Sequence, residues 1–154
     1  MTTRAEGTCR FMTATHETTI DAAEDRVWRA LVEETSRWWR DGFYALPNAV
    51  SMRIEARIGG AMVELAADGS AVVWANVIGI QPGRSLDLAG HLSAAFGGPA
   101  LVLIRFDVMP KDRVTLVRAS ESRVGNVEGG AADACAKAWS ALLSGGLKPF
   151  IERW

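Results

Sequence analysis

The last part of the chain carries the feature that most restricts the fold, a long amphipathic segment. From Ala131 to Arg153, apolar side chains recur at helical spacing and cover one broad face. Such a helix must pack this face against another layer of the molecule. The apolar face consists of Cys135, Ala138, Trp139, Leu142, Leu143, Gly146, Leu147, Phe150 and Ile151.

This helix contains one residue that disfavours a regular helical turn. Pro149 has no N–H group, and its ring would strike the carbonyl group of Gly145. We therefore expect a bend near Gly145 and Gly146.

The middle of the chain supplies the other layer, because its pattern predicts antiparallel strands. Residues 51–58 alternate between apolar and polar side chains, and Gly59-Gly60 predicts a turn into the next strand. Residues 72–80 are almost all apolar, which predicts a central strand covered on both faces. Residues 90–99 are expected to form a flexible loop. Strands are predicted at 15–20, 51–58, 61–65, 72–80, 85–89, 100–109 and 114–124.

Two short helices are predicted between the first two strands. Asp21 offers a side-chain oxygen as the N-cap of the first helix, which continues through Leu31. The second helix is expected at residues 35–40 and carries Trp38 and Trp39. Adjacent helical residues diverge by about 100°, so only one of these two indoles is expected to point inward.

The size and composition of the chain allow one ordinary globular domain. With 154 residues, of which 49% are hydrophobic and 23% charged, the chain can bury a sizeable core. We expect a flexible tail at residues 1–10 and a single α+β domain at residues 11–154. In this domain, a strongly curved antiparallel sheet wraps the terminal helix, and the two early helices close one end.

Charge and targeting signals exclude several classes of function. The formal net charge of −1 gives no electrostatic footprint for nucleic acid. No segment has the roughly 20 consecutive apolar residues of a membrane-spanning helix, so membrane insertion is not expected. Cys9 and Cys135 form no metal-binding pair, and we expect two free thiols in a reducing cytoplasm.

Four local patterns resemble those of the START-like, or SRPBCC, superfamily, whose helix-grip fold is shared with the birch pollen allergen. The branch that looks most similar is named after the ATPase activator of the ninety-kilodalton heat-shock chaperone, and its bacterial members also carry polyketide-cyclase labels. The patterns are Ile20-Asp21-Ala22 followed by Val27 to Leu31 with Trp38-Trp39, Ile58 to Glu64, Val77 to Leu86, and the final hairpin and helix with Phe106, Pro110, Thr115, Trp139, Leu143, Leu147 and Phe150.

A sheet that grips a helix leaves a tapered space between them. If side chains do not fill it, this space becomes an apolar pocket for a small hydrophobic or aromatic molecule; the alternative is a closed, fully packed core. The six Trp, five Phe and five Met residues are bulky enough to fill it. The candidate ligand-binding residues are Trp39, Ile54, Trp74, Phe106, Ala119, Glu121, Trp139, Leu143 and Leu147.

Period-two alternation separates the charges in the last two strands. With Phe106 inward, Arg105 faces solvent, and with Ala119 inward, Arg118 faces solvent and Glu121 faces the cavity. Glu121 is therefore the one charged residue among the candidates. His91 lies at the expected cavity mouth and could act as a general base, although most such histidines are plain surface residues.

The sequence contains no nucleophile, phosphate-loop, metalloprotease or dinucleotide motif, so we assign no catalytic residue, metal or cofactor. We expect a non-enzymatic binding module for a small apolar or aromatic molecule. Two alternatives stay open: an enzyme similar to polyketide aromatase/cyclases, with Glu121 or His91 moving a proton, and a protein-interaction domain similar to the chaperone activator. The protein partner, if there is one, is unknown.

Overall fold

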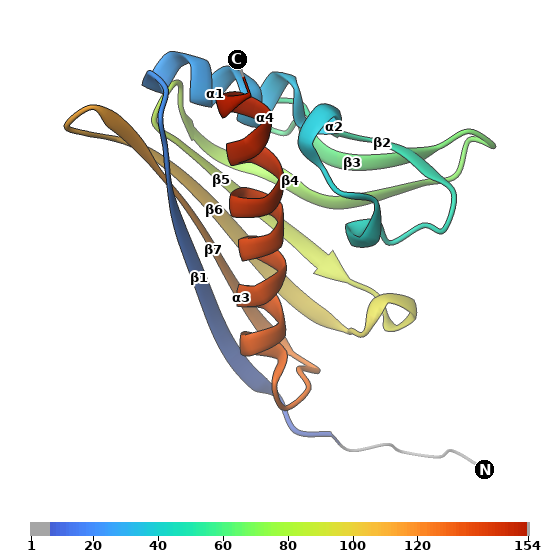
Figure 1. Cartoon of the computed structure of the whole chain (residues 1–154). Helices are drawn as coiled ribbons and strands as arrows, with labels where there is room; N and C mark the ends of the chain where they lie inside the picture. Colours follow the sequence, from blue (N-terminus) through green and yellow to red (C-terminus); the bar gives the residue numbers. More distant parts are fainter. Residues whose placement is uncertain (1–6, 154) are drawn as a thin grey trace, which may run out of the picture.

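The computed structural model describes residues 7–153, in which a long C-terminal helix lies across one face of a curved sheet (Figure 1). The predicted α+β helix-grip arrangement is confirmed. The elements are β1 (Arg10–Ile20), α1 (Glu24–Glu33), α2 (Thr35–Trp38), the 3-10 turn η1 (Asp41–Phe43), β2 (Ala49–Ile54), β3 (Ala61–Ala66), β4 (Ala71–Gln81), β5 (Ser85–Leu92), the 3-10 turn η2 (Ala94–Phe96), β6 (Ala100–Lys111), β7 (Val114–Gly125), α3 (Ala131–Leu142), the π-helical turn η3 (Leu143–Leu147) and α4 (Lys148–Glu152).

The seven strands form one antiparallel sheet in the order β1-β7-β6-β5-β4-β3-β2. Chain neighbours pair as hairpins from β2 to β7, whereas β1 pairs with the last strand. Helices α1 and α2 cross one end of the sheet, close to the C-terminal end of the long helix (Figure 1). No helix among residues 7–153 is long and apolar enough to cross a membrane.

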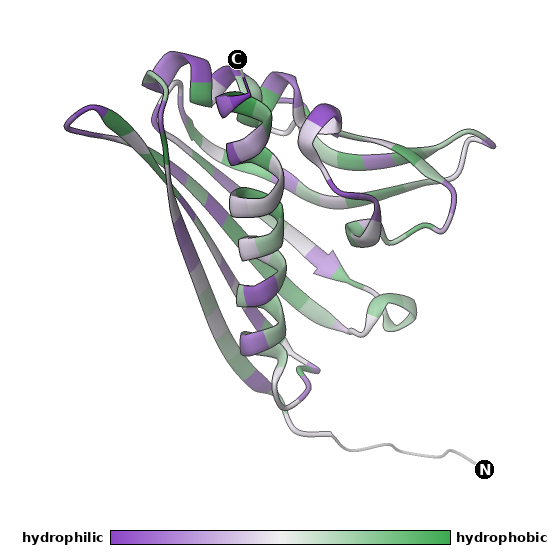
Figure 2. Cartoon of the chain, in the orientation of Figure 1, coloured by the Kyte–Doolittle hydropathy of each residue, from purple (hydrophilic) through white to green (hydrophobic). Residues whose placement is uncertain are grey.

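The strands bury alternate residues toward the helix, as a sheet with one covered face requires. In β6, Val102, Ile104, Phe106 and Val108 are buried while their neighbours are more exposed. Apolar and polar segments both occur along the strands (Figure 2), although the exposed Leu101 and Leu103 of β6 are also apolar. The hairpin of β6 and β7 was predicted at nearly these bounds, because its alternation is long and regular.

Strand β4 does not have two covered faces, so that prediction is wrong. Val73 and Ile78 are 50% and 59% exposed. The helices cover only the concave face of the sheet (Figure 1), and the apolar side chains on the other face of β4 meet solvent. A strand in the middle of this sheet can therefore have only one buried face.

Several element ends also differ from the prediction. β1 begins at Arg10, because its pairing with β7 continues to Arg10↔Gly125. The predicted tail at residues 1–10 therefore overlaps this strand at one residue. Residues 1–6 of that tail lie outside the described part of the chain. β2 ends at Ile54, and residues 55–60 form a tight turn instead of more strand. β5 continues to Leu92, which shortens the predicted loop.

Asp21 is not the N-cap of α1, contrary to the prediction. The N-cap residue is Ala23, which has no side-chain cap bond. The backbone turns before the helix starts, and the Asp21 N–H donates instead to Oε1 of Glu152 in α4 at 2.8 Å. This hydrogen bond joins the end of β1 to the end of α4.

Trp38 and Trp39 are both buried, so the prediction that only one points inward is wrong. Helix α2 ends at Trp38, and Trp39 already has extended angles of φ −63° and ψ 132°. The helical divergence of about 100° therefore does not apply between them. Their indole N–H groups donate to the carbonyl oxygens of Ala30 at 2.8 Å and Phe43 at 3.3 Å.

The C-terminal helix runs without interruption through Gly145 and Gly146, where a bend was expected (Figure 1). Instead of a bend, the helix contains the wider π-helical turn η3. At the end of this turn, the Lys148 N–H donates a hydrogen bond to the Leu143 carbonyl oxygen. This wider turn accommodates Pro149, which cannot donate a backbone bond. It also places Gly146 directly against the Trp38 carbonyl.

We expect Gly146→Ala to destabilise the protein and Gly145→Ala to serve as its matched control. A Cβ at Gly146 would lie 2.5 Å from the Trp38 carbonyl oxygen, whereas one at Gly145 would meet the movable Nη1 of Arg40 at 2.9 Å. Overpacking against backbone should lower the free energy of unfolding of Gly146→Ala by about 1–3 kcal/mol. Urea denaturation measures this, and equal stability of the two variants would contradict the close approach.

Candidate functional site

The side chains of the C-terminal helix change in volume along its length. Toward the sheet, the second half carries bulky residues that are almost completely buried: Trp139, Leu142, Leu143, Leu147 and Ile151. The first half carries small side chains: Ala131, Ala132, Ala134, Cys135, Ala136 and Ala138. Small side chains cannot fill the space over a curved sheet, so any cavity is expected at the first half of the helix.

An apolar cavity lies where strands β4 and β5 separate. Their pairing ends at Asn76↔Ala89, although β4 begins earlier, at Ala71, and β5 continues to Leu92. The cavity has a volume of about 240 Å³ and is called the inner cavity below. It is lined by Ala45, Val72, Val73, Trp74, His91, Leu92, Phe96, Val102, Ile104, Glu121 and Arg123.

A second hollow, the outer groove, adjoins the inner cavity. It has a volume of about 370 Å³ and lies between the segment that follows β5 and the first turns of α3. Leu92, Phe96 and Arg123 line both spaces. Ala131, Ala134, Cys135 and Ala138 form its helical wall. The small residues of α3 therefore border the groove, as their volume implies.

The polar chemistry of the inner cavity is concentrated at Glu121. Its carboxylate is 4% exposed, and Oε2 accepts a bond from Arg123 Nε at 2.5 Å. The other oxygen, Oε1, accepts a bond from Trp139 Nε1 at 3.1 Å. A buried carboxylate needs such partners, because an unpaired charge in an apolar site is strongly disfavoured. Arg123 is 31% exposed and lines both spaces, so this ion pair lies where the inner cavity and the outer groove meet.

A second buried carboxylate, Glu64, holds the wall of the cavity in place. It is 0% exposed and accepts bonds from the backbone N–H groups of Ala45 at 2.8 Å and Leu46 at 2.5 Å. Trp74 Nε1 donates to the same carboxylate at 2.8 Å. Glu64 thus positions two lining residues, Ala45 and Trp74. Glu64 is not among the residues predicted from the sequence. An acidic residue within the apolar strand at residues 61–65 was the feature that could have identified it.

Aromatic rings fill the middle of the space between the sheet and the C-terminal helix, so no open cavity forms there. Trp39 lies 5.6 Å from Trp74 and 6.2 Å from Trp139 between ring centroids, and Phe106 lies 5.3 Å from Trp139. All three pairs are edge-to-face, a favourable geometry for aromatic packing. The inner cavity is the space that this aromatic cluster leaves open at one end.

The candidate ligand-binding residues divide between the cavity and the core. Trp74 and Glu121 line the inner cavity. The other candidates belong to the buried core and line neither the inner cavity nor the outer groove: Trp39, Ile54, Phe106, Ala119, Trp139, Leu143 and Leu147. The parity prediction is confirmed, because Glu121 faces inward while Arg105 and Arg118 form ion pairs on the outer surface. Ligand contact by any of these residues stays a prediction.

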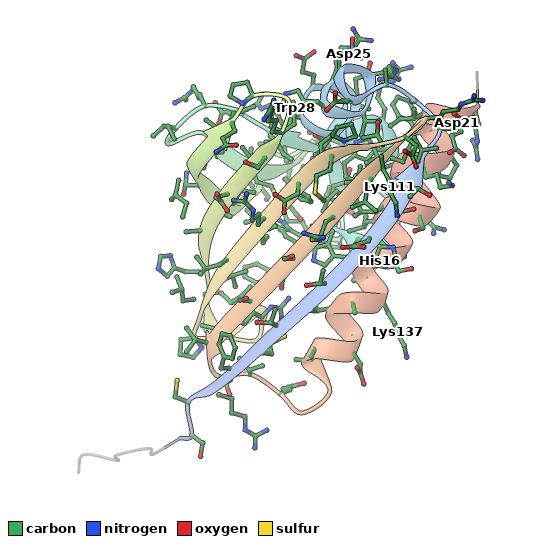
Figure 3. The ribbon with its side chains drawn as sticks, turned by 90° about the vertical axis from the view of Figure 1, so that its left-hand side faces the viewer. His16, Asp21, Asp25, Trp28, Lys111 and Lys137 are labelled. Atoms are coloured by element: carbon green, nitrogen blue, oxygen red, sulfur yellow. The ribbon has the colours of Figure 1, made fainter. Side chains whose placement is uncertain are left out.

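The two histidines lie in different surroundings. His91 is exposed and contributes to the wall of the inner cavity. His16 lies on β1, and its Nε2 is 2.9 Å from Ser144 Oγ in the C-terminal helix (Figure 3). Within residues 7–153, no three His, Cys, Asp or Glu side chains are grouped as they would need to be to hold a metal ion.

The thiol of Cys135 shares the environment of Glu121. Both cysteines are free, with Cys9 exposed and Cys135 buried. Burial raises the pKa of the Cys135 thiol to about 12, with further contributions from the charge of Glu121 and a hydrogen bond to it. An unfolded thiol has a pKa of about 8.5, so the folded protein holds this proton more tightly.

This pKa shift predicts a loss of stability in alkaline solution. The stabilisation is complete below about pH 8.5 and is lost as the pH rises toward the folded pKa. Between pH 8.5 and 10.5, the free energy of unfolding should fall more steeply for the wild type than for Cys135→Ala, by up to about 1.4 kcal/mol per pH unit. Urea denaturation at several pH values measures both slopes, and identical slopes would contradict the buried, Glu121-coupled thiol.

Comparisons with known proteins bear on the fold. Neither protein-family models nor curated proteins give a match to this chain. Among solved structures, a protein from Rhizobium leguminosarum has a TM-score of 0.69 at 20% identity, over 96% of this chain and 98% of that chain.

Two further structures carry names that bear on the sequence motifs. The Aha1 dimer from Colwellia psychrerythraea gives a TM-score of 0.62 at 18% identity, over 92% of this chain and 96% of that chain. Ara h 8.0201 gives 0.66 at 11% identity, over 92% and 98%. At such low identity, these likenesses show a shared fold. The chain therefore shares with these structures its fold, a curved antiparallel sheet packed against a long C-terminal helix, as the sequence predicted.

Proposed function

We propose that this protein binds a small apolar or aromatic molecule in the inner cavity and outer groove. The observation that carries the proposal is an apolar cavity with an ion pair, between the buried Glu121 and the partly exposed Arg123, at its junction with the groove. Small-molecule sites are typically apolar with a few convergent polar groups. The apolar walls would supply affinity, and the polar groups would fix orientation.

The volumes limit the ligand. Small-molecule sites usually have volumes of about 300–1,000 Å³. The inner cavity, at about 240 Å³, is smaller than this range, so the ligand would extend into the adjoining groove of about 370 Å³. An apolar body would lie among Val102, Ile104 and Trp74. A polar end would reach Arg123 at the junction.

The residues take separate roles in this proposal. Trp74 and Glu121 would contact the ligand, and the other seven candidates would pack the core that shapes the cavity. Glu64 would act as a positioning residue through Ala45 and Trp74. Phe96, which is 42% exposed and lines both spaces, would cover the ligand.

The two alternatives have less support. A cyclase would need Glu121 or His91 to move a proton, but both oxygens of Glu121 already accept bonds from Arg123 and Trp139. The Aha1 likeness at 18% identity favours a protein-interaction role only through the shared fold. A binding module uses the cavity and the ion pair as they stand, without a rearrangement of hydrogen bonds.

A bulky residue in the outer groove should weaken ligand binding. Ala134 lines the groove, so Ala134→Phe would occupy the space that a ligand needs. Lys137→Phe is the matched control, because Lys137 lies on the same helix and points away from the sheet (Figure 3). With fatty acids and aromatic carboxylic acids as probes, we expect at least about tenfold weaker binding for Ala134→Phe alone.

Native mass spectrometry of the purified protein and thermal shifts with these probes provide the measurement. A retained small mass, or a raised melting temperature that Ala134→Phe removes, supports the proposal. If the wild type carries no added mass and no probe shifts its melting temperature, the proposal fails. Equal binding by both phenylalanine variants would place the ligand outside the groove.

A further inference from the structure

A separate hollow lies at the other end of the C-terminal helix from the inner cavity. It has a volume of about 680 Å³ and is formed by residues 37–43, from the end of α2 through η1, and by residues 141–153 at the end of the C-terminal helix. We call it the arginine groove. The outer groove borders the first half of the same helix. Within residues 7–153, the arginine groove shares no lining residue with the outer groove or with the inner cavity.

The arginine groove concentrates positive charge on a chain with a net charge of −1. Arg37, Arg40 and Arg153 line it, and Asp41 is its one acidic residue. Among residues 7–153, neither Arg40 nor Arg153 takes part in an ion pair. Arg37 lies 4.0 Å from Oε1 of Glu34, whose other oxygen pairs with Arg26 at 2.8 Å.

Two of these arginines contact the C-terminal helix. Arg40 lies across Gly145 and Gly146, since a Cβ at these positions would meet Nη1 and Cγ of Arg40 at 2.9 and 3.5 Å. Arg37 is held by Phe150, with its guanidinium carbon 5.2 Å from the ring centroid. One arginine thus stacks on an aromatic ring, another lies over two glycines, and both border the same hollow.

We propose that the arginine groove binds a phosphate monoester. Guanidinium groups match phosphate oxygens with paired N–H donors, and three of them against a single carboxylate favour a dianion over a monoanion. The groove is also much larger than a bare ion, and Trp39, Phe43 and Pro149 give it apolar walls. The bound molecule therefore carries the phosphate on an organic body, either as a free metabolite or as a lipid headgroup.

Titration calorimetry with phenyl phosphate at low salt tests this proposal. We expect saturable binding that weakens as sodium chloride is added, because the contacts are ionic. Arg40→Gln should weaken binding by about tenfold, since it removes hydrogen bonds to a charged group. Arg40 makes no ion pair within the described chain, so this variant should keep the wild-type melting temperature, which is measured alongside.

Arg29→Gln is the matched control, because Arg29 is an exposed arginine of α1 that lies outside the groove. It should bind phenyl phosphate as the wild type does. Vesicles with and without phosphatidic acid identify the source: binding to vesicles alone indicates a lipid headgroup, and binding to phenyl phosphate alone a free ester. Absence of both, or binding that Arg40→Gln and Arg29→Gln reduce equally, overturns the proposal.

Discussion

The packing of the C-terminal helix against the concave sheet is the interaction on which the rest of the structure depends. Its second half fills the grip with Trp139, Leu142 and Leu147, and the aromatic cluster completes this core. Its first half carries mainly alanine, which leaves space above the sheet. One helix therefore divides the grip into a packed half, which supplies stability, and an open half, which can hold a ligand.

Two buried carboxylates organise the open half. Glu64 holds Ala45 and Trp74 at the wall, and Glu121 holds Arg123 and Trp139 at the junction of cavity and groove. Burying these acids is costly, and the cost is offset by hydrogen bonds from backbone, indole or guanidinium donors. Such satisfied polar groups fix the shape of an otherwise apolar site. Burial, with Glu121 beside the thiol, also accounts for the raised pKa of Cys135.

Periodicity predicted the elements whose burial alternates over many residues, such as β6, β7 and the inward position of Glu121. It failed where tertiary structure decides: the uncovered face of β4, the extended backbone at Trp39 and the π-helical turn before Pro149. The cavity position could not be predicted either, because it depends on where β4 and β5 separate. The change in side-chain volume along the C-terminal helix is visible in the sequence. It indicates the position of the cavity only once the contact between the helix and the sheet is known.

The division of the grip can be tested most directly by methyl NMR during titration with an apolar carboxylic acid that binds. If the open half holds the ligand, the methyl signals of Leu92, Val102 and Ile104 shift, while those of Leu142, Leu147 and Ile151 in the packed half stay in place. Shifts centred on the packed half, with none at the cavity wall, would contradict this account of the fold and its function.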